Sequence, residues 1–457
     1  MTVIEELIEA LGQGAVLTGA AIGERHRSDA SLSGRSLPEA VLRPASVEAV
    51  SAALSICNRH RLSVVPQGGL TGLAGGANPE AGAIALSLER FSGVEEIDAA
   101  AATMTVRAGT PLQMAQQAAE EAGFLLPIDL GSRGSCQIGG NLSTNAGGVR
   151  VIRHGVTRDN VLGLEAVLAD GTVLSSLNKM MKNNTGYDLR QLFIGAEGTL
   201  GVITRAVLKL KPLPAGRQTA LCALASYDDV LRLLDLARTG LAGLSAFEAM
   251  WASFFHFNAG ELGLSFFETD HRFAVIVEEE TRAGDGEGEA FDAFLGAAFE
   301  EGIIADALIA QSEKERASFW TVREGAPLDR LPSLVNFDVS LAIGALDDFA
   351  MACEAALLER FPGAHVSFFG HVGDSNLHIA VSVAGSTEET LHEIDAVVYR
   401  LVRDFGGSIS AEHGIGTLKR AYLGYSRSAA EIEVMRRIKA ALDPNGILNP
   451  GKVIPSH

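Results

Sequence analysis

Apolar positions recur with a helical period at the start of the chain. Ile4, Leu7, Ile8 and Leu11 have the spacing of one helix face, which predicts a helix over residues 1 to about 15. A polar stretch follows and runs to Pro38. Residues 1–37 are therefore expected to form an N-terminal helix and arm.

From Glu39 onward, short apolar runs alternate with helical segments, which is typical of mixed α and β structure. Ser46 is the expected N-cap of one of these helices. Asp170-Gly171 lies between two apolar runs and predicts a β-hairpin over residues 160–174. The other predicted strands are residues 40–44, 62–66, 83–88 and 103–110, and the predicted helices are residues 46–60 and 111–123.

After Pro214 glycine becomes sparser and longer helical patterns alternate with strands. This change predicts a second, α+β domain over residues 215–425. Within it, apolar runs on both sides of residues 372–376 predict two short strands joined by a tight turn. Residues 426–457 are expected to form a last helix and a turn-rich arm.

Composition narrows the class of protein. The chain has 457 residues, enough for two or three domains, and 47% of them are apolar, as in a globular protein. The net charge of −19 argues against non-specific nucleic-acid binding, and an anionic substrate would need a local cationic pocket. The four cysteines form no CxxC pair, which favours a reducing compartment, the cytoplasm. No apolar run approaches the roughly 20 residues of a membrane span.

Glycine is concentrated between residues 67 and 201, which suggests backbone packed against a ligand. The first cluster, residues 67–76, can form a nest of N–H groups for phosphate oxygens. It is neither a Walker loop nor a Rossmann fingerprint, because no GK[ST] follows and no long helix begins there. The second cluster, residues 125–155, offers many small and amide side chains, which suit a large polar cofactor. The third cluster is Gly195 to Gly201.

Two segments carry metal-ligand chemistry. GHVGDSNLH places His371 and His378 around the predicted turn, and AEHGIG places Glu412 beside His413. Two histidines and one carboxylate leave an open coordination position, as in a catalytic site for a divalent metal. His413 is then available as a base near neutral pH. The spacing alone leaves Zn, Mn and Fe open.

The motifs together resemble one known family. PQGGLTGLAGG, LGSRGSCQIGGNLSTNAGG, NNTGYDL, IGAEGTLGVIT, GHVGDSNLH, SAEHGIG and LDPNGILNPGK occur in that order. They resemble the FAD-linked D-2-hydroxyacid dehydrogenases of the vanillyl-alcohol-oxidase-like superfamily, and most of all the D-2-hydroxyglutarate dehydrogenase branch. The resemblance covers about residue 38 to residue 453. It implies an α+β protein with a two-part PCMH-type FAD-binding domain over residues 38–214. Residues 215–425 would form an α+β cap domain with an antiparallel sheet, which would hold the substrate and the metal, and the C-terminal arm would return to the FAD domain.

The resemblance also implies which residues would contact FAD. The first loop has no histidine, so FAD is expected to bind without a covalent link. The expected cofactor-binding residues are Pro66, Gln67, Gly68, Gly69, Leu70, Thr71, Gly72, Ser135, Gly139, Gly140, Asn141, Thr144, Asn145, Gly147, Gly148, Glu197, Gly198, Gly201, Ile203 and Asn449.

The remaining site residues follow from the same resemblance. His371, His378 and Glu412 match the metal ligands of the family, with zinc as the expected metal, and His413 matches its catalytic base. Arg323 matches the arginine that binds the substrate carboxylate, and Asn376 a polar residue at the substrate. The implied reaction is transfer of the C2 hydride of a D-2-hydroxyacid to the flavin, which gives the 2-oxoacid.

One departure concerns the substrate tail. D-2-hydroxyglutarate enzymes usually have a lysine where this chain has Asn336, and often a hydroxyl residue where it has Pro327. A D-2-hydroxyglutarate-type substrate is favoured by the resemblance. The alternative is D-lactate or another D-2-hydroxyacid with a neutral tail.

Other classes of function stay open at this stage. A zinc hydrolase would use His413 as a base but leaves the glycine clusters unexplained, and a flavin subunit without turnover or an oxygen-using flavin oxidase would bind FAD in the same way. The electron acceptor is expected to be an electron-transfer flavoprotein, a cytochrome or a quinone. A nicotinamide acceptor is disfavoured because the sequence lacks a Rossmann fingerprint. A homodimer is left open as the assembly.

Overall fold

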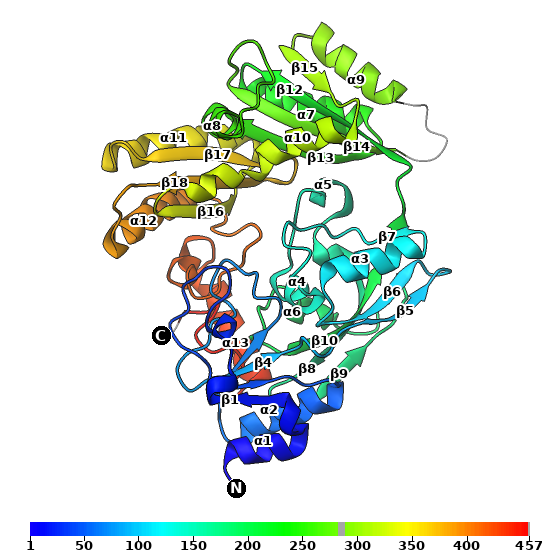
Figure 1. Ribbon diagram of the computed structural model, residues 1–457, viewed down its shortest axis with the longest axis vertical. Coiled ribbons are helices and arrows are strands. Elements are labelled where there is room, and N and C mark those ends of the chain that lie inside the picture. Colours follow the sequence, from blue (N-terminus) through cyan, green and yellow to red (C-terminus); the bar gives the residue numbers. More distant parts are fainter. Residues whose placement is uncertain (282–287, 456–457) are drawn as a thin grey trace. The chain divides into compact units, whose positions relative to one another are not determined.

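A computed structural model describes residues 1–281 and 288–455 (Figure 1). The chain divides into two compact units: unit 1 is Met1–Gly148, Gly155–Leu213 and Glu412–His457, and unit 2 is Val149–His154 and Pro214–Ala411. The predicted divisions after residues 37 and 425 do not coincide with these units. The N-terminal arm belongs to unit 1, and the chain returns to unit 1 at Glu412. The returning segment is held by two hydrogen bonds, which the N–H groups of Thr417 and Leu418 donate to the Ala74 carbonyl oxygen.

Unit 1 contains a four-stranded sheet near its N-terminal helices. The strand order is β1 (Val16–Thr18), β2 (Ala40–Leu42), β4 (Ile84–Ser87) and β3 (Val64–Gln67). Helix α1 (Val3–Leu11) packs against α2 (Val47–Arg59). The Ser46 hydroxyl accepts a hydrogen bond from the Ala49 N–H at 3.2 Å, which confirms the predicted N-cap.

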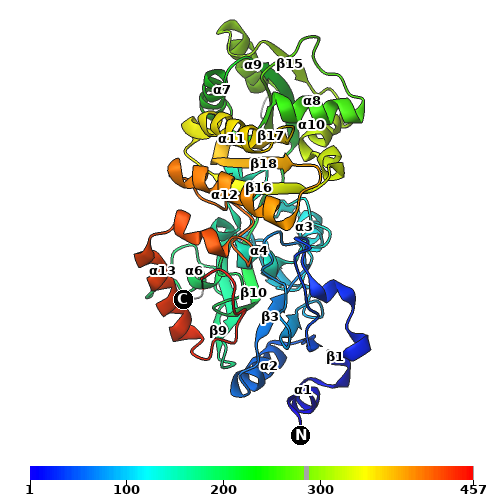
Figure 2. The ribbon, with the colours of Figure 1, turned by 90° about the vertical axis from the view of Figure 1, so that its left-hand side faces the viewer.

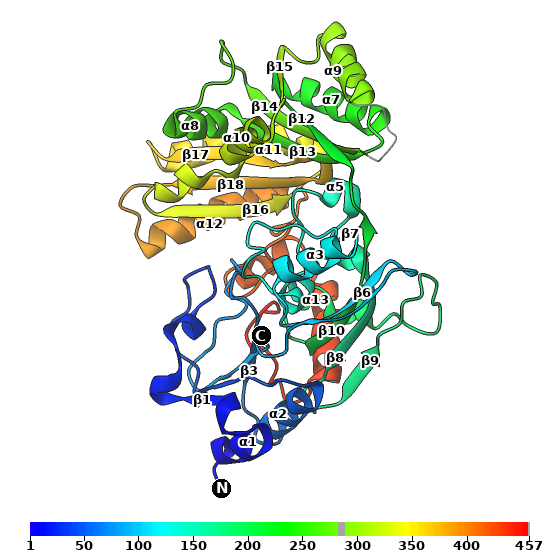
Figure 3. The same cartoon turned by 45° about the vertical axis from the view of Figure 1, so that its right-hand side comes forward.

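A second, five-stranded sheet of unit 1 has the order β5 (Val94–Asp98), β6 (Thr103–Arg107), β10 (Val202–Lys209), β8 (Val161–Val167) and β9 (Val173–Ser176) (Figure 3). The predicted hairpin at Asp170-Gly171 is confirmed, since β8 and β9 pair antiparallel. The two sheets share one apolar core. Besides short 3-10 helices, the other described elements of unit 1 are α3 (Leu112–Glu121), β7 (Phe124–Leu125), α4 (Ile138–Thr144), α6 (Arg190–Phe193), β11 (Lys211–Pro212) and α13 (Ala429–Leu442).

Unit 2 is built on a seven-stranded sheet, and every pairing in it is antiparallel, as expected. The strand order is β15 (Asp306–Ile309), β12 (Gly216–Leu224), β14 (Phe273–Thr281), β13 (Leu244–Trp251), β17 (His365–His371), β18 (Asn376–Ser382) and β16 (Leu334–Ser340). The predicted histidine hairpin is confirmed: η7 (Val372–Asp374) joins β17 to β18, and Ser375 completes the turn at a φ of 75°.

Helices cover both faces of this sheet (Figure 2). On one face lie α7 (Tyr227–Gly240), α11 (Leu346–Arg360) and α12 (Glu388–Asp404), with α9 (Glu289–Glu300) packed on α7. On the other face lie α8 (Ala252–Leu262) and α10 (Glu313–Glu324), followed by η5 (Ala326–Arg330). Side chains alternate between the two faces of a strand. Glu248 and Met250 of β13 therefore point to the α8 and α10 face, and Phe247 and Ala249 point to the other.

The described residues contain no helix that is both long enough and apolar enough to cross a bilayer. Each of the four cysteines is a buried free thiol. Burial raises the pKa of Cys57, Cys222 and Cys353 to about 12, so these thiols stay protonated at neutral pH.

A buried charge network fixes residues 149–154, which include α5 (Val151–His154), to the sheet of unit 2. Arg150 Nη1 donates to Glu278 of β14 at 2.7 Å, and Arg153 Nε lies 3.0 Å from Glu280. Burial alone would raise the pKa of Glu280, but the hydrogen bond of His154 and the charge of Arg150 lower it to about 2. The Glu280 carboxylate is therefore ionised wherever the protein is folded at ordinary pH.

We expect Glu280→Gln to lower the free energy of unfolding near neutral pH by on the order of 1–2 kcal/mol, with solvent screening allowed for. Because the folded pKa lies below the ordinary value of 4.5, this contribution is present above pH 4.5 and is lost as the pH falls towards 2. Urea denaturation followed across this pH range measures it. Equal denaturation midpoints for the two proteins at every pH would contradict the assignment.

Candidate active site

A cavity of about 790 Å³ lies in unit 1, and the three glycine clusters form its walls. Most of the residues expected to contact FAD line it. These are Pro66, Gln67, Gly68, Gly69, Leu70, Thr71, Gly72, Ser135, Gly139, Gly140, Asn141, Thr144, Gly147, Glu197, Gly198, Gly201 and Ile203. Several further lining residues lie outside the expected set and ranges, among them Asp29, Leu130 and Ser132.

The cavity suits a large polar cofactor. Gln137 Oε1 and Asn141 Nδ2 are buried polar atoms of its lining that have no hydrogen-bond partner in the protein. Buried amide atoms are rarely left unpaired, so a polar ligand would satisfy them. A Cβ on Gly140 would meet no atom within 4 Å, which leaves space beside the wall. These features fit the amide and phosphate groups of FAD.

Some of the glycines serve contact between backbone segments and not contact with a ligand. A Cβ on Gly69 would lie 2.0 Å from the Ser135 carbonyl oxygen, and one on Gly139 would lie 2.8 Å from the Ala108 Cβ. The residue between the first-loop glycines and Thr71, Leu70, has a φ of 59°, in the left-handed region that disfavours large side chains. The first loop is therefore pressed against the second, and this contact shapes the cavity.

We expect Gly69→Ala to purify with little or no FAD, because the added methyl group forces the first and second loops apart. Gly14→Ala is the matched control, since a Cβ there meets nothing within 4 Å and its φ is ordinary. Visible flavin absorbance per protein measures the result. A Gly69→Ala protein with the flavin content of the control would show that this contact does not shape the cofactor cavity.

Three residues expected to contact FAD do not line the cavity. Asn145 ends α4 at a φ of 51°, and its side chain accepts a hydrogen bond from the Arg158 N–H at 2.9 Å. A Cβ on Gly148 would lie 2.0 Å from the Asp129 carbonyl oxygen. Asn449 donates to the carbonyl oxygens of Gly76 and Glu197 at 2.9 and 2.7 Å. In the structure these residues hold the loops around the cavity.

Glu197 holds the segment with the candidate base at the cavity wall. Its carboxylate accepts hydrogen bonds from the N–H groups of Ile415 and Gly416 at 2.7 and 2.8 Å. Burial raises the pKa of Glu197, although these hydrogen bonds oppose the shift. Glu412 and His413, which directly precede this segment, both line the cavity. An imidazole is thus placed at the wall of the candidate cofactor cavity.

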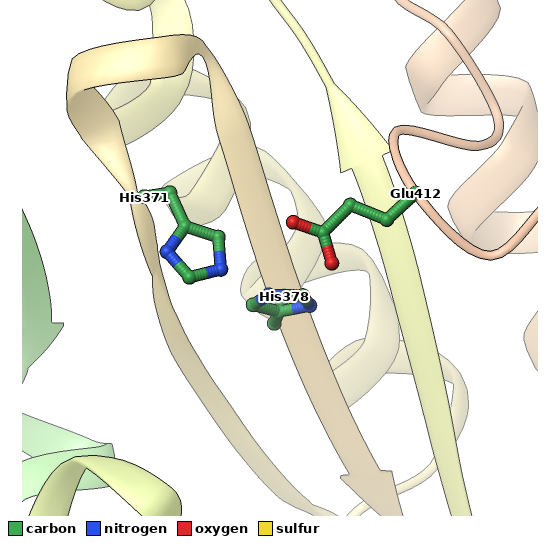
Figure 4. Close-up of side chains that lie close together, drawn as sticks. All are labelled: His371, His378 and Glu412. Carbon is green, nitrogen blue, oxygen red and sulfur yellow. The ribbon is translucent and has the colours of Figure 1, made fainter. Parts of the chain in front are cut away.

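The candidate metal ligands come together as the sequence predicts (Figure 4). Ligand atoms of His371, His378 and Glu412 all lie within 4.8 Å of one another. His371 ends β17, His378 lies in β18, and Glu412 directly follows Ala411, the last residue of unit 2. Two imidazoles and one carboxylate form a donor set that suits zinc and similar divalent ions.

A second group of possible ligands is Asp338, Glu412 and His413. Asp338 is fully buried in β16, opposite His378. Its Oδ2 accepts a hydrogen bond from the Ala411 N–H at 3.2 Å. Asp338 thus holds the backbone that leads to Glu412.

Glu248 of β13 links His371 to Arg323. Its two carboxylate oxygens lie 2.6 Å from His371 Nδ1 and 2.6 Å from Arg323 Nε. Burial alone would raise the pKa of Glu248, but the charges of His371 and Arg323 lower it to about 2. Arg323 is buried near the end of α10, and its guanidinium lies 4.7 Å from the centre of the Phe369 ring. This arrangement fixes a cation beside the candidate metal ligand His371.

The two candidate substrate asparagines differ in environment. Asn376 is only 3% exposed, and neither polar atom of its amide has a hydrogen-bond partner in the protein. Such an amide is suited to a substrate. Asn336 is exposed in β16, the edge strand, where it lies opposite Ala380 of β18. Pro327 is buried in η5.

Comparison with known proteins gives consistent matches over nearly the whole chain. Residues 38–176 match the family model "FAD binding domain", and residues 213–453 match "FAD linked oxidases, C-terminal domain". The chain is 42% identical to D-2-hydroxyglutarate dehydrogenase of Xanthomonas citri pv. viticola, over 92% of this chain and 90% of that protein. It is 40% identical to the mitochondrial D-2-hydroxyglutarate dehydrogenase of Bos taurus, over 93% of this chain and 78% of that protein.

Among solved structures, 4-ethylphenol oxidase from Gulosibacter chungangensis matches with a TM-score of 0.76 and 20% identity, over 99% of this chain and 96% of that one. This likeness concerns the fold alone. It agrees with the PCMH-type architecture expected from the sequence.

Proposed function

This chain belongs to the FAD-linked D-2-hydroxyacid dehydrogenases, and on that premise we propose that it oxidises D-2-hydroxyglutarate to 2-oxoglutarate with a metal ion and a histidine base. The observation that carries the proposal is the position of Glu412 and His413. Glu412 groups with His371 and His378 as a metal ligand, and His413, the next residue, lines the candidate FAD cavity.

Each group has a defined part in the proposed reaction. FAD supplies the hydride acceptor when bound, and the protein supplies orientation and electrostatics. A divalent ion, zinc in this proposal, supplies Lewis-acid polarisation of the C2 hydroxyl. His413 accepts the hydroxyl proton. Arg323 binds the C1 carboxylate through a terminal nitrogen of its guanidinium, and the Asn376 amide provides a further hydrogen bond to the substrate.

The choice of D-2-hydroxyglutarate rests on the names and the identity of the two dehydrogenases above. A second candidate is a D-2-hydroxyacid with a neutral tail, such as D-lactate. On the sheet face that carries His378, the neighbouring row consists of Ser367, Ala380 and Asn336. These side chains are uncharged, whereas a distal carboxylate is bound best by a cation.

Three further features complete the proposal. The electron acceptor is an electron-transfer flavoprotein, a cytochrome or a quinone, because the dehydrogenase must pass its electrons on. The protein acts in the cytoplasm, in keeping with its four free thiols. A homodimer is the assembly to be tested by light scattering.

The function is tested by steady-state oxidation with an artificial dye as acceptor. We expect turnover with D-2-hydroxyglutarate and none with its L-enantiomer. Faster turnover with D-lactate would move the assignment to the second candidate, and no turnover with any D-2-hydroxyacid would contradict both.

In the same assay we expect Arg323→Met to lower kcat/KM by at least about tenfold, chiefly through a higher KM, because a charge-assisted hydrogen bond to the carboxylate is lost. Arg330→Met, at an exposed position of η5, is the control. An unchanged kcat/KM for Arg323→Met would place the carboxylate elsewhere.

A further inference from the structure

Glu248 stands out because sequence reasoning does not select it and the proposed reaction does not use it. It is the one charged residue of the strand segment LSAFEAMW, and its side chain is fully buried. A buried carboxylate is costly unless it is paired. Both of its partners are residues that we assign to the site: His371 and Arg323.

The first contact determines which nitrogen of His371 can bind a metal. With Nδ1 2.6 Å from Glu248 Oε1, the Nδ1–H donates to the carboxylate, and the lone pair is left on Nε2. A carboxylate behind a metal-binding imidazole fixes the ring orientation and strengthens the ligand, and removing such a partner typically costs about 10- to 100-fold in metal affinity.

The second contact determines how Arg323 is oriented. Its Nε donates to Glu248 Oε2 at 2.6 Å, so the side of the guanidinium that carries Nε is occupied. Of the two terminal nitrogens, Nη2 lies within hydrogen-bond distance of His371 Nε2, at 3.5 Å, and Nη1 is the one we assign to the substrate carboxylate. The position of the guanidinium is also limited by the Phe369 ring, which stacks on Phe254 with ring centres 4.1 Å apart.

We propose that Glu248 is a shared positioning residue that couples the metal ligand His371 to the carboxylate-binding Arg323, so that metal affinity and substrate affinity depend on one side chain. This inference rests on the proposed function. Its three residues, Glu248, His371 and Arg323, all belong to unit 2. It accounts for a buried acid whose two oxygens each serve a different part of the site.

Glu248→Gln separates the two contacts with little change of shape. An amide has one acceptor and one donor, so it can accept from His371 or from Arg323 but not from both. The other partner then faces an N–H group. One of the two hydrogen bonds, to His371 or to Arg323, is therefore lost in either orientation of the amide. Glu248→Asp keeps the charge on a shorter side chain and is the conservative variant.

The test measures zinc affinity and KM in parallel. FAD-loaded protein is stripped of metal and titrated with zinc in competition with a chromogenic chelator, and KM is measured after zinc is restored. For Glu248→Gln we expect zinc affinity to fall about 10- to 100-fold and KM to rise at least about tenfold. For Glu248→Asp we expect smaller changes in both quantities.

Glu278→Gln is the matched control. Glu278 is also fully buried, lies on the neighbouring strand β14, and accepts a hydrogen bond from an arginine, Arg150. Its substitution removes an equally buried charge, and its hydrogen-bond partners Arg150, Thr219 and Trp320 are not residues that we assign to the site. Zinc affinity and KM of this variant should stay within about twofold of the wild type.

A double substitution distinguishes coupling from general loosening. If Glu248 acts on the substrate through Arg323, Glu248→Gln should raise KM much less in an Arg323→Met background than in the wild type. Equal effects in both backgrounds would overturn the inference.

The zinc titration separates this inference from the proposed function, because it needs no turnover. Wild-type zinc affinity in a folded Glu248→Gln protein would overturn the inference and leave the proposed function intact. A wild-type protein that binds no zinc would overturn both. If Glu248→Gln does not fold, Glu248→Asp is compared with the Glu278→Gln control in the same two measurements. Wild-type zinc affinity and wild-type KM in Glu248→Asp would then contradict the inference.

Discussion

His413→Asn should retain FAD and lose turnover by about 100- to 10,000-fold, the usual contribution of a positioned general base. The asparagine keeps a polar side chain at the cavity wall, where His413 lies beside the loop that Glu197 holds. It cannot accept the hydroxyl proton. Turnover with a dye acceptor and flavin absorbance per protein measure the two quantities on the same preparation.

The control for this variant is His256→Asn, in an exposed turn of α8 away from the site residues. Its turnover and FAD content should equal those of the wild type. Near-wild-type turnover of His413→Asn would remove it as the base. Loss of FAD from His413→Asn would instead give this residue a part in holding the cofactor.

Removal of the metal should abolish turnover, by at least about a thousandfold, while the yellow colour remains. A divalent ion lowers the activation free energy by several kcal/mol, because it stabilises the negative charge that develops as the hydroxyl is deprotonated. Each 1.4 kcal/mol corresponds to about tenfold in rate. The FAD cavity is formed by residues of unit 1, so chelation of a metal held by His371 and His378 should leave it filled. Zinc, manganese and iron are then added back separately to identify the metal.

His378→Asn removes one of the candidate metal ligands and should have the same effect as chelation. His365→Asn is its matched control. His365 lies on β17, the strand that ends with His371, and packs against the Phe257 ring. The control should keep its metal and its activity. Activity that survives in protein shown by elemental analysis to be free of metal would contradict the metal mechanism.

Much of the fold follows from local patterns in the sequence. The Ser46 cap, the Asp170-Gly171 hairpin and the histidine hairpin are confirmed because short-range rules determine each of them. Helix α8 was not predicted, since the run ASFFHFNAGEL is apolar on several sides and has little helical periodicity. The unit boundary at Glu412 depends on contacts with residues far away in the sequence, such as Ala74, which no local pattern encodes.

The candidate site divides in the same way. Residues in glycine-rich motifs, such as His371 and Glu412, are found by sequence because the motif marks them. Glu248 and Asp338 have no such mark: each is the one charged residue of its strand, and its part depends on strand register. The sequence signal for these two residues is an acidic side chain in a strand that is expected to be buried. A buried charge requires a partner, so such a residue is a candidate for the site. Asn449 returns to unit 1 as expected and donates to the carbonyl oxygens of Gly76 and Glu197, and its contact with FAD stays a prediction.

The central claim is tested most directly by anaerobic bleaching of the flavin band with a panel of 2-hydroxyacids in both enantiomers. This half-reaction needs no electron acceptor, so it isolates substrate, FAD and metal. The account predicts that D-2-hydroxyglutarate, or a D-2-hydroxyacid with a neutral tail, bleaches the flavin and that its L-enantiomer does not. A yellow, metal-loaded protein that no D-2-hydroxyacid bleaches would contradict the account.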